Sequence, residues 1–181
     1  MLVVISGTHA SGKSTLISDF AERHPDFQVL PDPFELLDDG DVEPGTDSFS
    51  AQLQLAAARL TDPERGISSI AERGPLDFLA YLDALISLRR PGGSPTLFRN
   101  GLAATATAMA HVDLLVLLPL ADADRIEVPA DEDLELRAAM NDSLLDLAED
   151  PDLAGNASIV EITGSPTRRL RQLEDAIQSL H

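Results

Sequence analysis

The segment from Gly7 to Ser14 constrains the fold of this chain more than any other part of its sequence. It runs Gly-Thr-His-Ala-Ser-Gly-Lys-Ser and matches the phosphate-binding loop pattern G-x-x-x-x-G-K-[ST] at every fixed position. Lys13 is the only lysine in the 181 residues, and the rest of the 13 basic residues are arginine. The exception falls where a slim ammonium group must reach the β- and γ-phosphates, which a planar guanidinium fits badly. The pattern therefore predicts a loop that binds a nucleoside triphosphate.

The residues on either side of this loop provide the setting that it requires. Residues 2–5 form a short apolar run that predicts a buried strand, and residues 14–21 have the apolar spacing of a helix. We expect the backbone amides of residues 8–14 to hold the β-phosphate, Lys13 to bridge the β- and γ-phosphates, and Ser14 to bind Mg²⁺. The residues expected to bind ATP are Gly7, Thr8, His9, Ala10, Ser11, Gly12, Lys13, Ser14 and Thr15.

Short apolar runs recur along the chain and alternate with helical patterns. They predict five strands, at residues 2–5, 28–30, 67–71, 114–118 and 159–162. Helical spacing follows Gly74-Pro75, and near the end Ser165 has the residue type of an N-cap before Pro166. This alternation predicts an α/β fold, with a parallel sheet and helices on both of its faces. The phosphates would then lie at the carboxyl end of the first strand.

The composition limits the class of protein and its partners. The net charge is −18, from 13 basic and 31 acidic residues, which argues against nucleic acid polymers and anionic membranes as partners. No apolar run approaches the ~18–20 residues of a membrane span, and the first strand begins too close to Met1 for a leader peptide. The absence of cysteine excludes disulfides and thiolate metal sites and is consistent with a cytoplasmic protein. The length suits one domain over residues 1–181, with acidic, solvated loops at residues 38–41 and 131–133.

Two further segments place charged residues at the ends of predicted strands. Glu72 and Arg73 follow the third strand, where their side chains can reach the crevice that holds the phosphates. A carboxylate there can hold Mg²⁺ and an arginine can orient the acceptor, although a strand-end salt bridge explains the pair equally well. Asp32 follows the second strand and could accept the proton of an attacking hydroxyl. The alternatives are that Asp32 only begins a turn, or that Glu35 is the base.

Together these motifs resemble the P-loop kinases of the deoxynucleoside kinase type and, equally, the small AAA-type ATPases that are similar to nicotinamide riboside kinase. The shared features are the phosphate loop, an Asp-Pro after the second strand, a Glu-Arg-Gly after the third, and a helix that carries Gln52 and Arg59 seven positions apart. The resemblance implies the three-layer sandwich of P-loop NTPases, with five parallel strands in the order 2-3-1-4-5. It implies Asp32 as the general base and Glu72 beside Mg²⁺. It also implies that Gln52 contacts the acceptor, with Arg59 and Arg73 near the phosphates or the acceptor hydroxyl.

Other parts of the family pattern are less clear in this chain. An arginine-rich lid is expected after the fourth strand, but residues 121–127 are acidic and hold only Arg125, with Arg137 on the next helix. Either arginine could close on the transferred phosphoryl group, and either could be a surface salt-bridge partner. Residues 164–166 lie where related kinases pass a loop over adenine, and a helix cap explains them equally well.

The motifs together predict a kinase that transfers the γ-phosphate of ATP, with Mg²⁺, to a hydroxyl of a nucleoside or of a nucleoside-like or sugar-like metabolite. The predicted catalytic residues are Lys13, Asp32, Arg73 and Arg125, and the predicted acceptor-binding residues are Gln52, Arg59, Glu72 and Arg73. Three phenylalanines could stack on a base, but core packing explains each of them better. They are Phe34, Phe49 and Phe78.

Two alternatives remain at the level of sequence. One is a regulatory module that binds a nucleotide and acts on a protein. The other is a nucleoside-monophosphate kinase, which usually needs several arginines around its charged acceptor. A GTPase would usually carry an Asn-Lys-x-Asp motif, which requires a lysine outside the phosphate loop. The alanine-rich stretch of residues 102–109 could pack on the sheet or on a second subunit of a homodimer.

Overall fold

A computed structural model describes residues 1–36, 46–121, 128–130 and 132–180, with no side chains described for residues 35, 36 and 46–49. Its strands are β1 (Leu2–Ser6), β2 (Gln28–Leu30), β3 (Ser69–Glu72), β4 (Leu114–Leu117) and β5 (Ser158–Glu161). All four strand pairings are parallel, and the order across the five-stranded sheet is β2-β3-β1-β4-β5. The predicted α/β fold and strand order are therefore confirmed.

The third strand differs from its prediction by a small shift along the chain. The apolar run predicted a strand over residues 67–71, but β3 begins at Ser69 and ends at Glu72. Ile67 is 92% exposed and precedes the ladder, whereas Glu72 pairs with Ile5 of β1. The predicted start of the strand at Ile67 is therefore wrong, because the pairing with β1 determines where β3 begins and ends.

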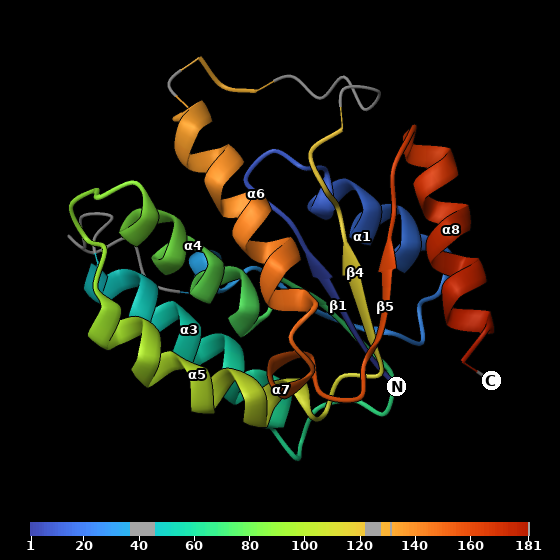
Figure 1. Cartoon of the computed structure of the whole chain (residues 1–181). Coiled ribbons are helices and arrows are strands. Elements are labelled where there is room, and N and C mark those ends of the chain that lie inside the picture. The colour runs from blue at the N-terminus through green and yellow to red at the C-terminus, as the bar shows by residue number, and fades with distance from the viewer. Residues whose placement is uncertain (37–45, 122–127, 131, 181) are drawn as a thin grey trace.

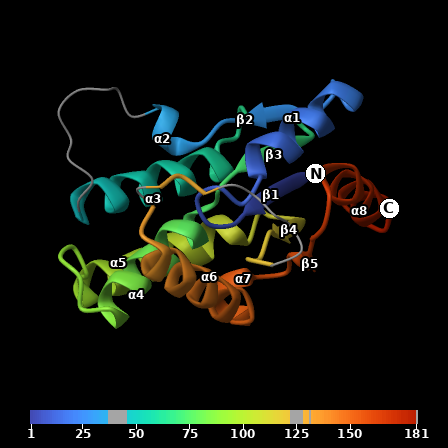
Figure 2. The ribbon, with the colours of Figure 1, turned by 90° about the horizontal axis from the view of Figure 1, so that it is seen from above.

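Helices cover both faces of the sheet and make three layers (Figures 1 and 2). They are α1 (Lys13–Arg23), α2 (Pro33–Leu36), α3 (Thr46–Thr61), α4 (Pro75–Ser87), α5 (Pro95–Met109), α6 (Leu134–Ala148), α7 (Pro151–Ala154) and α8 (Pro166–Gln178). Figure 2 shows α1 and α8 on one side of the strands and α3 to α7 on the other. The sheet is thus covered as the alternating pattern predicted.

The central strand β1 is buried on both faces, as its uninterrupted apolar sequence predicted. Val3 and Ile5 pack in the cluster formed with α1 and α8, while Leu2 and Val4 pack in the cluster formed with α3 to α7. These four side chains are at most 1% exposed. Burial of each such side chain stabilises the fold by about 1.5–3 kcal/mol. The loop that follows Ser6 therefore leaves from a strand that is firmly anchored.

Short polar side chains cap the amino ends of α5 and α6. Ser94 at the start of α5 and Asp133 at the start of α6 each accept a hydrogen bond from the N–H three residues later, at 3.3 and 3.0 Å. The helix α8 begins at Pro166 after Ser165, as predicted, although the Ser165 hydroxyl makes no capping hydrogen bond. These caps satisfy N–H groups that the helices themselves leave free.

A buried carboxylate on α4 connects the ends of β1 and β3. Asp77 is fully buried, and its oxygens accept hydrogen bonds from the Ser6 hydroxyl at 2.6 Å and from the N–H groups of Gly7 and Gly74, both at 2.9 Å. Ser6 ends β1, and Gly74 is the N-cap residue of α4. The carboxylate therefore fixes the start of the phosphate loop against the turn that follows β3.

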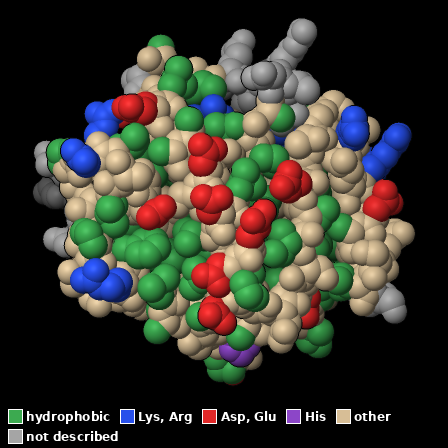
Figure 3. Space-filling view, viewed as in Figure 1, with side chains coloured by type: hydrophobic (Ala, Val, Ile, Leu, Met, Phe, Trp, Pro, Cys, Tyr) green, Lys and Arg blue, Asp and Glu red, His purple; other side chains and the backbone are tan. Residues whose placement is uncertain are grey.

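Acidic side chains lie among hydrophobic ones in the middle of the face that carries α6, and most of the basic side chains on this face lie nearer its edges (Figure 3). Asp142 and Asp146 on this helix are exposed, and so is Glu149, its C-cap residue. Such a surface repels polyanions. The predicted acidic loop at residues 38–41 lies outside the described residues. Among the helices that the structure describes, none combines the length and the apolar character that a membrane span requires.

We predict that Asp77→Asn lowers the free energy of unfolding by roughly 2–4 kcal/mol. An amide has one acceptor oxygen, so its NH₂ group would face N–H or O–H donors that the carboxylate now satisfies. Urea denaturation measures the loss. The matched control is Asp83→Asn on the same helix, where one oxygen accepts a single hydrogen bond from Ser143 at 2.7 Å, a bond that an amide oxygen can still accept. Equal stability of the two variants would contradict the role given to Asp77.

Candidate active site

The phosphate loop joins β1 to α1 through a tight turn that needs its glycines. A Cβ atom on Gly7 would lie 2.7 Å from Ser11 Oγ and 3.0 Å from the Leu118 carbonyl oxygen, so a side chain does not fit there. Gly12 precedes α1 with a φ of 86°, in the left-handed region that glycine adopts at no steric cost. Gly7 is therefore required because a Cβ atom would clash, and Gly12 because of its backbone angle. This turn places the amino end of α1 where it can bind an anion.

Side chains from two distant helices hold the carbonyl groups of this loop. Arg137 of α6 donates from Nε to the His9 carbonyl at 3.0 Å and from Nη2 to the next carbonyl at 3.2 Å. Arg169 of α8 donates from Nη1 to the Ser11 carbonyl at 2.6 Å. The His9 ring also pairs with Glu132 across 2.7 Å. Arg137, a predicted lid candidate, therefore binds the phosphate loop itself.

Lys13 is a buried cation inside this loop. It is 4% exposed, and its Nζ donates to the Thr8 carbonyl at 2.8 Å. Burial and the nearby charge of Arg73 lower the pKa of Lys13 to about 8, although carboxylates around it, chiefly Asp77, act in the opposite direction. A bound anion such as a phosphate would relieve this cost and favour the charged form.

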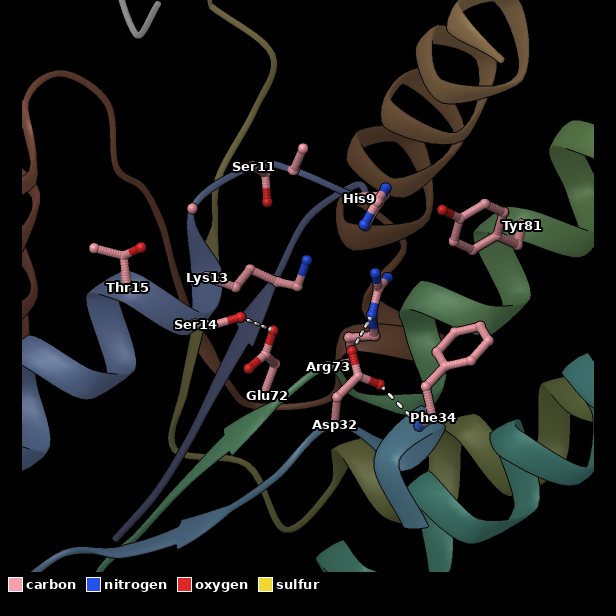
Figure 4. A pocket seen from close by; sticks show the side chains of 12 residues that line it. His9, Ser11, Lys13, Ser14, Thr15, Asp32, Phe34, Glu72, Arg73 and Tyr81 are labelled. Carbon is pink, nitrogen blue, oxygen red and sulfur yellow. Dashed lines mark hydrogen bonds and ion pairs between the residues drawn. The ribbon is translucent and has the colours of Figure 1, made fainter. Parts of the chain in front are cut away.

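A cavity of about 580 Å³ opens beside the loop (Figure 4). Its lining residues are His9, Ala10, Ser11, Gly12, Lys13, Ser14, Thr15, Asp32, Phe34, Glu72, Arg73 and Tyr81. They come from the loop and the start of α1, from the ends of β2 and β3, and from α2 and α4. The carboxyl ends of three parallel strands thus meet at one crevice, as the strand order requires.

Asp32 and Arg73 contact each other in the wall of this cavity. Arg73 Nε donates to Asp32 Oδ2 at 2.7 Å, and Asp32 Oδ1 accepts from the Phe34 N–H at 3.0 Å. Asp32 thus begins the turn into α2 and also forms an ion pair in the cavity. The Arg73 guanidinium lies 5.8 and 5.9 Å from the ring centres of Phe34 and Tyr81. Burial acts to lower the pKa of Arg73, but Asp77, Tyr81 and Asp32 outweigh it and raise the pKa above its ordinary value.

Ser14 and Glu72 bring two oxygen ligands together on the other side of the cavity. The Ser14 hydroxyl donates to Glu72 Oε1 at 2.8 Å, and both residues line the cavity. Mg²⁺ prefers oxygen ligands and usually completes its shell with water and substrate phosphates. Within the described residues there is no cluster of three or more histidine or acidic side chains arranged around a metal. The hydroxyl of Ser14 and the carboxylate of Glu72 are oxygen ligands of the kind that Mg²⁺ prefers.

The two residues predicted on α3 are not among the residues that line the cavity. Gln52 is 2% exposed and is not among the lining residues. Arg59 donates to the backbone carbonyls of Pro31, Glu72 and Arg73. Burial lowers the pKa of Arg59 to about 10, although nearby carboxylates raise it in part. Arg59 therefore contacts the backbone around the site.

Several other predicted residues have different outcomes. Arg125 lies outside the described residues, and so do the side chains of Glu35 and Phe49. Phe78 is fully buried in the core, as predicted. The core prediction for Phe34 is wrong, because this ring is 43% exposed and lines the cavity. The apolar residue type alone did not distinguish a core position from the wall of a binding site.

Three residues in or beside the site were not predicted from the sequence: Asp77, Tyr81 and Arg169. Asp77 lies three residues after Gly74, the spacing of a capping acid, and Tyr81 lies one helical turn beyond Asp77 on the same face of α4. That spacing could have pointed to both residues. Arg169 carries no such signal, because its partner is the Ser11 carbonyl, a backbone group far away in the chain.

Comparisons with known proteins find likeness in structure. A thymidylate kinase from Candida albicans has a TM-score of 0.69 and 18% identity, over 98% of this chain and 91% of that chain. A deoxyadenosine kinase from M. mycoides has a TM-score of 0.65 and 13% identity, over 100% of both chains. The NadR protein in complex with NR has a TM-score of 0.66 and 15% identity, over 99% of this chain and 51% of that chain.

No protein-family model and no curated protein sequence matches this chain. At these low identities the likeness to the solved structures concerns the fold. The sheet order, the loop after β1 and the helices on both faces agree with that likeness. The chain has the fold of the P-loop kinases of the deoxynucleoside and nucleotide kinase type, as the sequence resemblance implied.

Proposed function

We propose that this protein is a kinase that transfers the γ-phosphate of ATP to a hydroxyl group of a nucleoside or a nucleoside-like metabolite. The observation that carries the proposal is the joint position of Lys13, Asp32 and Arg73 on one cavity at the carboxyl ends of β1, β2 and β3. A phosphate loop alone would account for nucleotide binding. The carboxylate and guanidinium opposite it supply groups for a second substrate.

Each residue has a role in this proposal that follows from its surroundings. Amides of the loop and the Lys13 ammonium would hold the β- and γ-phosphates, where positive charge stabilises the transition state. Bound Mg²⁺, held by Ser14 and Glu72, would neutralise further phosphate charge. Asp32 would accept the hydroxyl proton late in the transfer, while Arg73 orients its carboxylate through the bond of 2.7 Å.

The charges around the cavity favour an acceptor without a phosphate group. Among the described lining residues, Lys13 and Arg73 are the only lysine and arginine. Lys13 belongs to the phosphate loop, and Arg73 is already paired with Asp32. A monophosphate at this place would compete with one carboxylate and lie near a second, Glu72. The rings of Phe34 and Tyr81 offer apolar surface to a flat group such as a base.

We expect ATP, Mg²⁺ and a mixture of nucleosides to give acceptor-dependent ADP release, and Lys13→Ala to abolish it. Asp32→Asn should lower kcat by about 10²- to 10⁴-fold, because the general base is lost, while the Kd for ATP changes little. A coupled assay measures ADP, and mass spectrometry identifies the phosphorylated product. The Asp83→Asn variant, away from the cavity, is the control and should keep native kinetics.

The acceptor class is tested by a parallel mixture of nucleoside monophosphates. The Candida thymidylate kinase neighbour makes these compounds the natural competitor. Turnover with monophosphates and none with nucleosides would contradict the proposed acceptor and indicate a nucleoside-monophosphate kinase. Full activity of Asp32→Asn would contradict its role as the base. Tight ATP binding without any acceptor-dependent turnover would favour a regulatory nucleotide-binding protein.

A second prediction concerns pH and follows from the pKa of Lys13 of about 8. Phosphates bind the protonated ammonium, so ATP binding raises this pKa. Below pH 8 the free protein already carries the proton, and the affinity for ATP is expected to be nearly constant. Above pH 8 the proton must be taken up on binding, so the affinity should fall by up to about tenfold per pH unit.

Titration calorimetry at pH 7, 8 and 9, in two buffers of different ionisation enthalpy, measures both the affinity and the proton uptake. Lys13→Met, which keeps an unbranched side chain of similar length, should bind ATP weakly and without this pH dependence. An unchanged affinity of the native protein between pH 7 and pH 9 would contradict the assignment.

A further inference from the structure

A single guanidinium, that of Arg59, holds the backbone at the ends of two neighbouring strands. Arg59 donates from Nη1 to the Pro31 carbonyl and from Nη2 to the carbonyls of Glu72 and Arg73. Pro31 follows β2, and Glu72 ends β3. The side chain reaches these groups from the last turn of α3. It therefore connects the two segments that carry Asp32 and Arg73.

The backbone of Arg73 has a positive φ angle, and hydrogen bonds fix the peptide groups before and after it. Its φ of 61° lies in the left-handed region, which residues other than glycine rarely adopt. Its N–H donates to the Ile5 carbonyl at 3.0 Å, and the carbonyls before and after its Cα accept from Arg59. The next N–H, that of Gly74, donates to Asp77 at 2.9 Å. These bonds direct the Arg73 side chain into the cavity.

The Asp32 side of the ion pair depends on the same guanidinium. The Pro31 carbonyl belongs to the peptide group that leads directly into Asp32, and it accepts from Arg59. The Asp32 carboxylate is then 2.7 Å from Arg73 Nε and makes its other bond to Phe34 within the turn. Both partners of the ion pair thus have their backbones bound by one side chain that does not line the cavity.

We infer that Arg59 is a positioning residue for phosphoryl transfer: by joining the Pro31, Glu72 and Arg73 carbonyls it sets the orientation of the Asp32–Arg73 pair. This inference rests on the proposed kinase function. It differs from the role that the sequence resemblance implied, in which Arg59 lies near the phosphates or the acceptor hydroxyl. A residue that touches the acceptor contributes to its binding, whereas a positioning residue contributes to the rate of the chemical step.

The test compares Arg59→Ala and Arg59→Lys with a matched control, Gln28→Ala. Gln28 lies at the opposite end of the same two strands, where its side-chain Oε1 accepts from the Gly66 N–H at 2.7 Å. Its backbone N–H donates to the Ser68 carbonyl at 2.9 Å, a bond that alanine keeps. Loss of its side chain loosens the β2–β3 region far from the cavity. Lysine at position 59 keeps the charge but cannot donate to three carbonyls in a fixed fork.

We expect kcat to fall by about 100-fold in Arg59→Ala, since a displacement of about 1 Å in a reacting group has that effect. The KM for the acceptor and the Kd for ATP should stay within about threefold of native. Arg59→Lys should be slowed nearly as much while its melting temperature stays close to native, and methylguanidinium should restore part of the kcat of Arg59→Ala. Gln28→Ala should keep native kcat. A raised acceptor KM at native kcat, or a kcat like that of Gln28→Ala, would overturn the inference.

Hydrogen exchange separates this inference from the proposed function. Amides of residues 72–74 should exchange faster in Arg59→Ala than in the native protein or in Gln28→Ala, whether or not an acceptor has been found. Unchanged exchange there would overturn the positioning role. Absence of acceptor-dependent turnover in the native protein would overturn the kinase proposal and leave the exchange result to decide whether Arg59 fixes this backbone.

Discussion

The site depends on the hydrogen bonds that the buried carboxylate of Asp77 accepts from the ends of β1 and β3. Parallel strands bring their carboxyl ends to one edge of a sheet, but they do not fix the loops that leave it. Asp77 does so by binding Ser6 and Gly7 on one side and Gly74 on the other. The phosphate loop and the turn that carries Arg73 are therefore held in a constant relation, with the cavity between them.

The cations of the site have separate tasks that follow from their chemistry. The compact ammonium of Lys13 occupies the space inside the loop, where burial lowers its pKa to about 8. The arginines use their several donors on carbonyl oxygens: Arg137 and Arg169 hold the phosphate loop, and Arg59 holds the ends of β2 and β3. Arg73 alone among these arginines lines the cavity, and it is paired with Asp32. Of these five described cations, the three arginines Arg59, Arg137 and Arg169 thus bind the backbone around the site.

The sequence was sufficient for the features that depend on local patterns. The glycines and the lysine of the loop, the apolar β1 and the alternation of strands and helices led to the correct sheet and to the position of the loop. The prediction failed where the register decides, at the start of β3, and where an apolar ring lines a cavity, at Phe34. The hydrogen-bond partners of Arg59 could not be predicted, because they are backbone carbonyls, which every residue has, in segments distant in the sequence. The spacing of Gln52 and Arg59 indicated a helix, but it did not predict which groups these two side chains contact.

In the proposed kinase, a triphosphate held by Lys13 presents its terminal phosphate to the Asp32–Arg73 pair. A crystal structure with Mg²⁺ and a non-hydrolysable ATP analogue would show this geometry. We predict that the γ-phosphate lies within hydrogen-bond distance of Lys13 Nζ and faces the Asp32 carboxylate across a space that admits one hydroxyl group. A γ-phosphate that points away from Asp32, or a nucleotide bound outside this cavity, would contradict the proposed mechanism.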